Sequence, residues 1–280
     1  MKVLKDRVAV VTGAGSGIGR ATAIELAREG CDLAISDVNE AGLAQTAEAI
    51  RALGRRACSH RVDVSDKERM RRYADEVVAE YGRVNVLINN AGVTVTAEFQ
   101  DHSLEDFEWL IGINFWGVVY GCKFFLPHLK QAGEGHIVNL SSVFGFAGFP
   151  AQSSYCASKF AVRGFSESLW VELREHNIGV TSIHPGGVRT NIAKSARSAG
   201  PAELQNTAED IIARAAVTPE RCARLIVKAI KKNKMRQLVA VESHALDWLK
   251  RVSPVLPQRL LQGGYARGIG RGGIKALPKR

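Results

Sequence analysis

The stretch Thr12-Gly-Ala-Gly-Ser-Gly-Ile-Gly19 decides how this chain folds. It joins an apolar run, residues 7–11, to an amphipathic segment, residues 17–29, which predicts a strand, a tight turn and a helix. Gly13 and Gly17 allow backbone angles and a close approach that a Cβ would block, and Gly19 lets the helix pack closely on the strand. The helix N-terminus offers free N–H groups and a positive dipole to a pyrophosphate. A tight turn without a ligand is the alternative.

An acidic residue at the end of the next apolar run adds to this prediction. Asp37 follows Gly19 by 18 residues, close to the ~20 expected for a carboxylate that accepts a hydrogen bond from an adenosine ribose 2′-hydroxyl. Such a carboxylate would repel a 2′-phosphate, and Val38 adds no cation beside it, so the pair favours NAD over NADP. In the alternative reading, Asp37 only forms a turn or caps the helix that begins near Asn39.

The rest of the chain alternates short Val- and Ile-rich runs with longer amphipathic stretches, the pattern of βαβ units and a parallel sheet. Strands are expected at residues 7–11, 32–36, 57–62, 84–88, 135–140, 180–184 and 237–241, and helices at 17–29, 40–53, 67–81, 104–129, 153–176 and 219–232. No Pro-rich or Ser-rich linker divides these elements. They predict a single doubly wound α/β Rossmann domain over residues 1–245, with a seven-stranded, mostly parallel sheet flanked by helices on both faces.

Composition excludes several other classes of protein. The 280 residues are 46% hydrophobic and 24% charged, which is typical of a globular chain and not of a disordered, collagen-like or coiled-coil one. The five cysteines are scattered, with no CxxC pair and no Cys/His cluster at zinc spacing, so neither a disulfide framework nor a metal site is expected. A reducing, cytoplasmic location fits this usage. We find no signal peptide and no stretch approaching the roughly 18 apolar residues of a membrane span.

The net charge of +10 is concentrated near the C-terminus. Residues 220–280 hold 15 Lys or Arg and 3 Asp or Glu, a balance of +12, which leaves −2 for residues 1–219. Residues 246–280 are therefore expected to form a basic extension that is broken by Pro254 and Pro257 and does not pack after Leu261. This extension could contact an anionic membrane surface; packing on its own or a neighbouring subunit is the alternative. Nucleic-acid binding is not expected, because no aromatic stacking platform accompanies the charge.

Tyr155 and Lys159 form a second candidate site. They are four residues apart in a helical stretch and so share one face. An ammonium beside a phenol stabilises the phenolate and lowers the phenol pKa, ordinarily about 10, so that the tyrosine can act as an acid or base. By itself the pair is equally compatible with a solvated contact on a helix surface.

Taken together, the motifs resemble one known family. They are TGAGSGIG at 12–19, NNAG at 89–92, Asn114, Ser142, YCASK at 155–159 and PGGVRT at 185–190. In order and spacing they resemble the short-chain dehydrogenase/reductase family, in its branch with a TGxxxGxG glycine motif and a YxxxK active site. The resemblance covers about residues 5–245, and none of these positions departs from the family pattern.

The resemblance implies four catalytic residues. Tyr155 would exchange a proton with the substrate oxygen, and Lys159 would lower the Tyr155 pKa and bind the nicotinamide ribose. Ser142, thirteen residues before Tyr155, would hydrogen-bond the same oxygen, whereas Ser141 fits that spacing less well. Asn114 would hold the water of a proton relay that links Lys159 to solvent.

The resemblance also implies a set of cofactor contacts. Those of the glycine turn would be Gly13, Ser16, Gly17, Ile18 and Gly19, with Asp37 on the ribose. The adenine end would be flanked by Asp63, Val64, Asn90, Ala91 and Gly92. The nicotinamide end would be lined by Pro185, Gly186, Val188 and Thr190, together with Tyr155 and Lys159.

The implied reaction is alcohol + NAD⁺ ⇌ ketone or aldehyde + NADH + H⁺. A lid is expected at about residues 190–218, over a pocket of mostly apolar residues: Thr94, Val95, Val143, Phe144, Phe149, Ala151, Gly187 and Val188. These favour an apolar substrate such as a steroid, a retinoid or an aliphatic alcohol, unless they only form core or cofactor walls.

Two other functions remain open at this point. A 3-ketoacyl-carrier-protein reductase would share the four catalytic residues and use a basic surface, although such reductases usually take NADPH. A non-catalytic NAD-binding regulator would explain the charge of the extension. The family also implies a homodimer or homotetramer, associated through the helices expected at 104–129 and 153–176.

Overall fold

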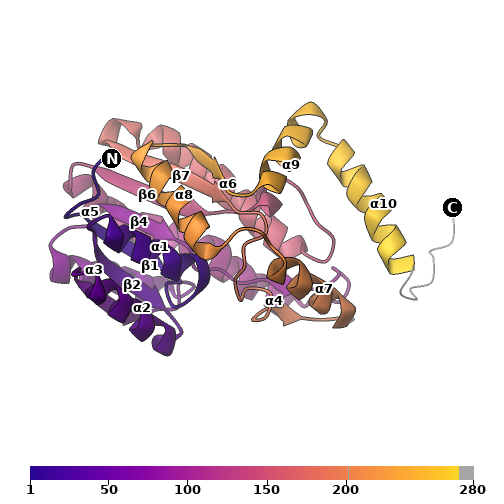
Figure 1. Cartoon of the computed structure of the whole chain (residues 1–280), viewed down its shortest axis with the longest axis horizontal. Helices are drawn as coiled ribbons and strands as arrows, with labels where there is room; N and C mark the ends of the chain where they lie inside the picture. The colour runs from indigo at the N-terminus through magenta and orange to yellow at the C-terminus, as the bar shows by residue number, and fades with distance from the viewer. Residues whose placement is uncertain (201, 271–280) are drawn as a thin grey trace.

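The computed structural model describes residues 1–200 and 202–270 and has a parallel sheet at its centre (Figure 1). Its seven strands are β1 (Val8–Thr12), β2 (Asp32–Asp37), β3 (Ala57–Arg61), β4 (Val86–Asn89), β6 (Gly135–Leu140), β7 (Ile178–His184) and β9 (Arg236–Leu238). They lie in the order β3-β2-β1-β4-β6-β7-β9, with every described pairing parallel. From β1 the chain builds the sheet in one direction through β2 and β3, and it then returns to β4, on the other side of β1, and continues in the opposite direction to β9. The expected doubly wound, seven-stranded domain is therefore confirmed.

Helices cover both faces of the sheet. They are α1 (Gly17–Arg28), α2 (Glu40–Ala52), α3 (Lys67–Tyr81), α5 (Gly117–Gln131), α6 (Ser153–Glu172) and α8 (Pro219–Lys231). Because successive strand residues point to opposite sides, Ala9 and Val11 of β1 enter the core under α1, α2 and α8, while Val10 enters the core under α3, α5 and α6. Because the strands are all parallel, their carboxyl ends meet at one edge of the sheet, between the two helix layers.

The fourth expected helix is interrupted. Its parts are α4 (Leu104–Ile111), a π-helical turn (Gly112–Trp116) and α5. By length and composition the combined helix Leu104–Gln131 could cross a membrane, so the prediction that no stretch approaches that length was wrong. Core helices of soluble proteins share this length and composition. Leu110, Phe125 and Leu129 on this helix are fully buried.

Two segments were not predicted as helices. Within the lid region lie a short strand, β8 (Arg197–Ser198), which pairs with β5 (Val95–Thr96), and helix α7 (Ala202–Ala213). Helix α9 (Val241–Val252) begins where the last strand was expected to end, three residues beyond the end of β9. No helix was expected in either region, because residues 190–218 were assigned to a lid and the chain after residue 241 to the end of a strand and an extension.

The extension also differs from its prediction. Helix α10 (Leu256–Gly270) follows α9 after a break at Pro254, whereas Pro257 lies in its first turn, and the helix continues well past Leu261. Its inner face packs: Gln258 donates to the Gly148 carbonyl oxygen (2.9 Å), and the Tyr265 hydroxyl donates to Glu98. The expectation that the chain does not pack after Leu261 is therefore wrong as far as Tyr265, and residues 271–280 lie outside the described residues.

Candidate active site

The glycine turn between β1 and α1 leaves its backbone open to a ligand. Gly13 and Gly17 have φ of +65° and +51°, and a Cβ on Gly13 would lie 2.7 Å from the Ala91 Cα. A Cβ on Gly19 would collide with the Gly13 carbonyl, so Gly19 allows α1 to pack against the turn. Ser16 precedes α1 without a side-chain capping bond, which leaves the first N–H groups of the helix free for an anion.

Asn90 and Thr12 hold this turn in place. The Thr12 hydroxyl oxygen accepts from the backbone N–H groups of Asn90 (3.0 Å) and Ala91 (3.1 Å). In return, the Asn90 side-chain amide donates to the carbonyl oxygens of Thr12 (2.9 Å) and Gly13 (3.1 Å). The carboxyl ends of β1 and β4 are thereby locked together, with Asn90 acting on the backbone of the turn.

Asp37 lies beside the turn at the end of β2. Its Oδ2 accepts from the Gly15 N–H (2.8 Å), and its Oδ1 accepts from the Asn39 N–H (3.0 Å). Asn39, and not Asp37, caps α2, because the Asn39 side chain accepts from the Gly42 N–H. The capping alternative for Asp37 is therefore wrong, whereas its role in a local turn is real. Val38 is 60% exposed and brings no charge to this corner.

One cavity of about 1130 Å³ collects nearly all the predicted site residues at this edge of the sheet. Only Gly19 and Asn114, among those residues, do not line it. The predicted substrate-pocket residues line it as well, except Val95, which is buried in a small core with Leu110. The glycine turn, Asp37 and Tyr155 thus share one continuous space.

The structure distinguishes the two serines at the end of β6. The Ser141 hydroxyl donates to the Lys159 carbonyl oxygen (2.8 Å) and so ties β6 to α6. The Ser142 hydroxyl oxygen accepts from the Phe144 N–H (3.2 Å), and the Ser142 side chain acts to lower the pKa of Tyr155. Ser142, and not Ser141, therefore acts on the Tyr155 phenol in this structure, and its catalytic role stays a prediction.

Burial controls the ionisation of Tyr155 and Lys159. It raises the pKa of Tyr155 to about 12, against the opposing hydrogen bond from Ser142, and it lowers the pKa of Lys159 to about 8. The Lys159 ammonium donates to the Leu140 carbonyl oxygen (2.9 Å) and lies 5.4 Å from the centre of the Tyr155 ring. Burial therefore sets the direction of the Tyr155 pKa in this structure, and the lowering by Lys159 that the family resemblance implies stays a prediction.

Asn114 lies in the π-helical turn and is fully buried. Its side chain accepts from the Val93 N–H (2.8 Å) and donates to the Val93 carbonyl oxygen (2.9 Å) and the Ser158 hydroxyl (3.3 Å). A Cβ on Gly92 would lie 3.3 Å from the Asn114 Oδ1 and 3.6 Å from the Lys159 Nζ, so Gly92 lets these side chains approach. Asn114 therefore holds the loop after β4 against α6, directly behind the ammonium.

Several cavity residues were not predicted from the sequence. Leu204, Ala208 and Ile212 line the cavity from α7, and Gly264 and Tyr265 line it from α10. The spacing of four residues along α7 is the signal that could have found the first three. The inner end of the cavity is apolar: Phe144 stacks on Phe149, with ring centres 4.0 Å apart.

Comparisons with known proteins agree with this architecture. The family model described as short chain dehydrogenase matches residues 7–200. The chain is 43% identical over 270 residues to the oxidoreductase SadH of Mycobacterium tuberculosis, covering 95% of this chain and 98% of that protein. It is 33% identical over 258 residues to epidermal retinol dehydrogenase 2 of Homo sapiens, covering 91% of this chain and 80% of that protein.

A solved structure is similar over almost the whole chain. The short chain dehydrogenase/reductase from Burkholderia phymatum, determined in complex with NAD, matches with a TM-score of 0.85 and 32% identity. The match covers 92% of this chain and 97% of that one.

Proposed function

Because this chain belongs to the short-chain dehydrogenase/reductase family, we propose that it transfers a hydride between NAD(H) and a secondary alcohol or ketone with an apolar body. One observation carries the proposal: Tyr155, Ser142 and Lys159 share a single cavity with the glycine turn and with apolar walls. This is the arrangement that an oxidoreductase needs to hold a dinucleotide against the carbon that reacts.

The cofactor is NAD, and the residues present fit it. The open backbone of the glycine turn and the uncapped start of α1 suit a diphosphate, and the Asp37 carboxylate beside them suits a ribose with free hydroxyls. The Burkholderia protein, of the same fold, holds NAD. When bound, NAD supplies the hydride acceptor and NADH the hydride donor.

The side chains of this chain would manage the proton and the substrate oxygen. In reduction, the hydroxyls of Ser142 and Tyr155 donate to the carbonyl oxygen, and Tyr155 then gives up its proton to form the alcohol. In oxidation, the Tyr155 oxygen takes the hydroxyl proton of the alcohol. Lys159 offers a cation behind Tyr155, and Asn114 and the π-helical turn hold the wall through which a proton relay would run.

The character of the cavity supports an apolar substrate. Valine, phenylalanine and leucine side chains from the end of β6, the loop before α6 and helix α7 line the same cavity as Tyr155. Lys159 is the one cation among the described residues that line the cavity, so nothing there would pair with a phosphate or carboxylate on the substrate. Steroids, retinoids and long aliphatic alcohols fit this chemistry, and one relative is named a retinol dehydrogenase.

The alternatives receive less support. A non-catalytic regulator would not need Tyr155, Ser142 and Lys159 around a substrate-sized space. A 3-ketoacyl-carrier-protein reductase usually takes NADPH, whose 2′-phosphate would meet the Asp37 carboxylate. The charge of the basic extension was the reason to consider the regulator and the carrier-protein reductase. The extension packs beside the cavity through Gln258 and Tyr265.

For assembly, we propose a homo-oligomer formed through α5 and α6. Trp116, 47% exposed, begins a row of stacked rings that continues with Tyr120 and Phe124. Phe160 and Val171 are exposed on α6. Light scattering would give the size of the assembly, and charged substitutions at Trp116 and Phe160 should dissociate it.

A peripheral membrane contact is a further proposal for α9 and α10. Trp248, Val252 and Leu260 are exposed there, with Arg251 and Arg259 beside them, a pattern suited to an anionic lipid surface. Flotation with anionic and neutral vesicles tests it. We expect the protein in the cytoplasm, in keeping with its five free cysteines.

The decisive experiment follows NADH absorbance with NAD⁺ or NADP⁺ over a panel of alcohols, from acetoin through aliphatic alcohols to hydroxysteroids and retinol. Tyr155→Phe tests the phenol, and Tyr120→Phe, outside the cavity, is the matched control. We expect turnover of apolar alcohols with NAD⁺ that falls about 10²-fold or more in Tyr155→Phe alone. Tight NAD binding without turnover on any compound would favour the regulator.

A further inference from the structure

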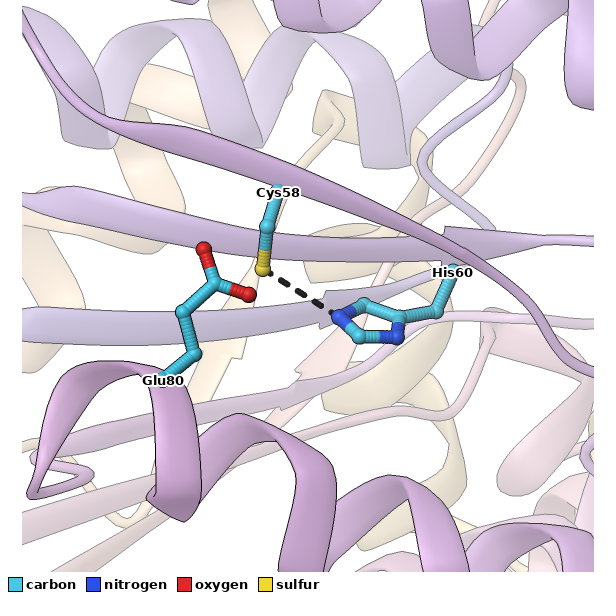
Figure 2. Close-up of side chains that lie close together, drawn as sticks. All are labelled: Cys58, His60 and Glu80. Atoms are coloured by element: carbon cyan, nitrogen blue, oxygen red, sulfur yellow. Dashed lines mark hydrogen bonds between the residues drawn. The ribbon is translucent and has the colours of Figure 1, made fainter.

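Three side chains that could bind a metal converge at the edge of the sheet, outside the active site. Cys58 and His60 lie two residues apart on β3 and so point to the same side of that edge strand, and Glu80 comes from the last turn of α3. Figure 2 shows the Glu80 carboxylate and the His60 ring on either side of the Cys58 sulfur. One ligand atom of each residue lies within 4.8 Å of the others. None of the three lines the active-site cavity.

The His60 ring is held in the orientation that a metal requires. Its Nδ1 lies 3.1 Å from a carboxylate oxygen of Glu76, which can only accept, so in the neutral ring Nδ1 carries the hydrogen. The lone pair of Nε2 then faces the Cys58 Sγ, 3.2 Å away. A carboxylate behind the distal ring nitrogen is the usual support for a zinc-binding histidine.

Further contacts fix this support. Arg69 binds both carboxylate oxygens of Glu76 (3.1 and 2.9 Å), and the His60 ring packs on Tyr73 with centres 5.0 Å apart. The ring therefore has little freedom to turn Nε2 away from the sulfur.

We propose that Cys58, His60 and Glu80 bind a Zn²⁺ ion through Sγ, Nε2 and one carboxylate oxygen, with water as the fourth ligand. A sulfur, nitrogen and oxygen donor set suits this cation, and three protein ligands leave one position open. Zn–S and Zn–N bonds at a tetrahedral angle place the two atoms about 3.5 Å apart, close to the 3.2 Å found here. Glu80 is exposed and free to move the remaining distance.

Binding would replace the thiol proton by the metal: the S–H bond breaks, an S–Zn bond forms and H⁺ leaves to solvent, without oxidation or reduction. The ion would join the edge strand to the end of α3. Strand β3 leads directly into Val62, Asp63 and Val64, which line the cavity. The bound ion would therefore stabilise the strand next to one end of the cofactor site.

The test uses the full chain after treatment with a chelator. Zn²⁺ titration by calorimetry should give one site per chain. Co²⁺ in its place should give the thiolate charge-transfer band and the strong visible bands of a tetrahedral site. We expect Cys58→Ser, His60→Gln and Glu80→Gln each to weaken Zn²⁺ binding roughly 10-fold or more, and Cys58→Ser to abolish the charge-transfer band.

Two matched variants serve as controls. Cys31→Ser changes a buried cysteine outside the cluster, and Glu48→Gln changes an exposed carboxylate on α2. Both should bind Zn²⁺ like the wild type. Glu80 is exposed, so Glu80→Gln tests the site even if a substitution at β3 unfolds the chain. The proposal is overturned if wild type and Glu80→Gln bind equally, or if the Co²⁺ spectrum lacks the thiolate band.

Discussion

The backbone N–H of Gly15 donates a 2.8 Å hydrogen bond to Oδ2 of Asp37. This bond places a carboxylate against the glycine turn, at the point where the ribose of a dinucleotide would lie. A Cβ on Gly15 would collide with the same carboxylate, so the residue at 15 must be small for the two to meet. Asp37 can therefore reject a 2′-phosphate by charge and, through its Oδ1, also shapes the turn into α2.

Asp37→Asn removes the negative charge but keeps the shape of the side chain, because the asparagine oxygen can still accept from the Gly15 N–H. We expect NAD⁺ to bind about 10-fold more weakly, since a hydrogen bond to a charged group contributes about 1.5–3 kcal/mol, and NADP⁺ to bind more tightly as repulsion is removed. Fluorescence titration with both dinucleotides measures this. Glu40→Gln, at an exposed carboxylate that starts α2, is the control. Equal weakening for both cofactors would mean that Asp37 only shapes the turn.

Substitution of the neighbouring residues Ser142 and Ser141 should have different effects on activity and stability. Ser142→Ala removes a donor to the reacting oxygen and is expected to lower kcat/KM about 10²–10³-fold with little change in stability. Ser141→Ala removes the bond to the Lys159 carbonyl and is expected to cost about 1 kcal/mol of unfolding free energy, with a smaller effect on kcat/KM. Steady-state kinetics and urea unfolding of both variants decide between the serines. A larger catalytic loss in Ser141→Ala would reverse the assignment.

The raised pKa of Tyr155 predicts an asymmetric pH profile. Oxidation needs the phenolate, which becomes commoner as pH rises toward the Tyr155 pKa of about 12, so kcat/KM for oxidation should increase with pH. Reduction uses the neutral phenol and should change little across the neutral range. Lys159 has a pKa of about 8 and loses its positive charge above that pH. This loss would make the increase of kcat/KM with pH less steep above about pH 8. An oxidation profile that is already flat below about pH 8 would contradict the burial argument.

Helix α10 contributes Tyr265 to the cavity wall. Replacing Tyr265 by Ala should reduce kcat/KM for bulky apolar alcohols about 10-fold, since burying a large apolar side chain against substrate contributes about 1.5–3 kcal/mol, and should leave short alcohols unaffected. Leu260→Ala, on the exposed side of the same helix, is the matched control. If short and bulky alcohols lose activity equally, α10 acts on stability and not on the shape of the pocket.

The parallel sheet could be predicted because its signals are local. Each strand is a run of apolar residues between turns, and strand ends differ from prediction by up to three residues, as at β9. The family resemblance carried by TGAGSGIG, Ser142 and Tyr155 named most of the residues that line the cavity, and they lie together because the carboxyl ends of parallel strands meet at one edge.

The features that were missed depend on contacts between distant parts of the chain. Helix α10 is held by Gly148 and Glu98, more than a hundred residues away in sequence. The raised pKa of Tyr155 follows from its burial, which the sequence does not show. The cluster of Cys58, His60 and Glu80 does not have the sequence spacing of known zinc sites, because Glu80 lies on the next helix, α3.

Two buried histidines predict that the fold loses stability in acid. His136 and His184 are fully buried, and burial lowers their pKa values to about 3 and about 4. Thr181 donates to the Lys234 carbonyl oxygen, so its hydroxyl oxygen accepts from the His136 Nε2–H (2.8 Å), while Nδ1 has no partner among the described residues. A second proton on His136 would therefore be buried without an acceptor.

The sign of the effect follows from these values. An unfolded histidine has a pKa of about 6.5, so below that pH the unfolded chain binds more protons than the folded one, and stability falls as pH falls. At about pH 5 each histidine should cost about 2 kcal/mol of unfolding free energy relative to neutral pH. Urea unfolding at the two pH values measures this loss. His136→Gln should remove about half of it, while His176→Gln, at an exposed position, should remove none. Equal losses in wild type and His136→Gln would show that carboxylates, and not buried imidazoles, set the acid limit of the fold.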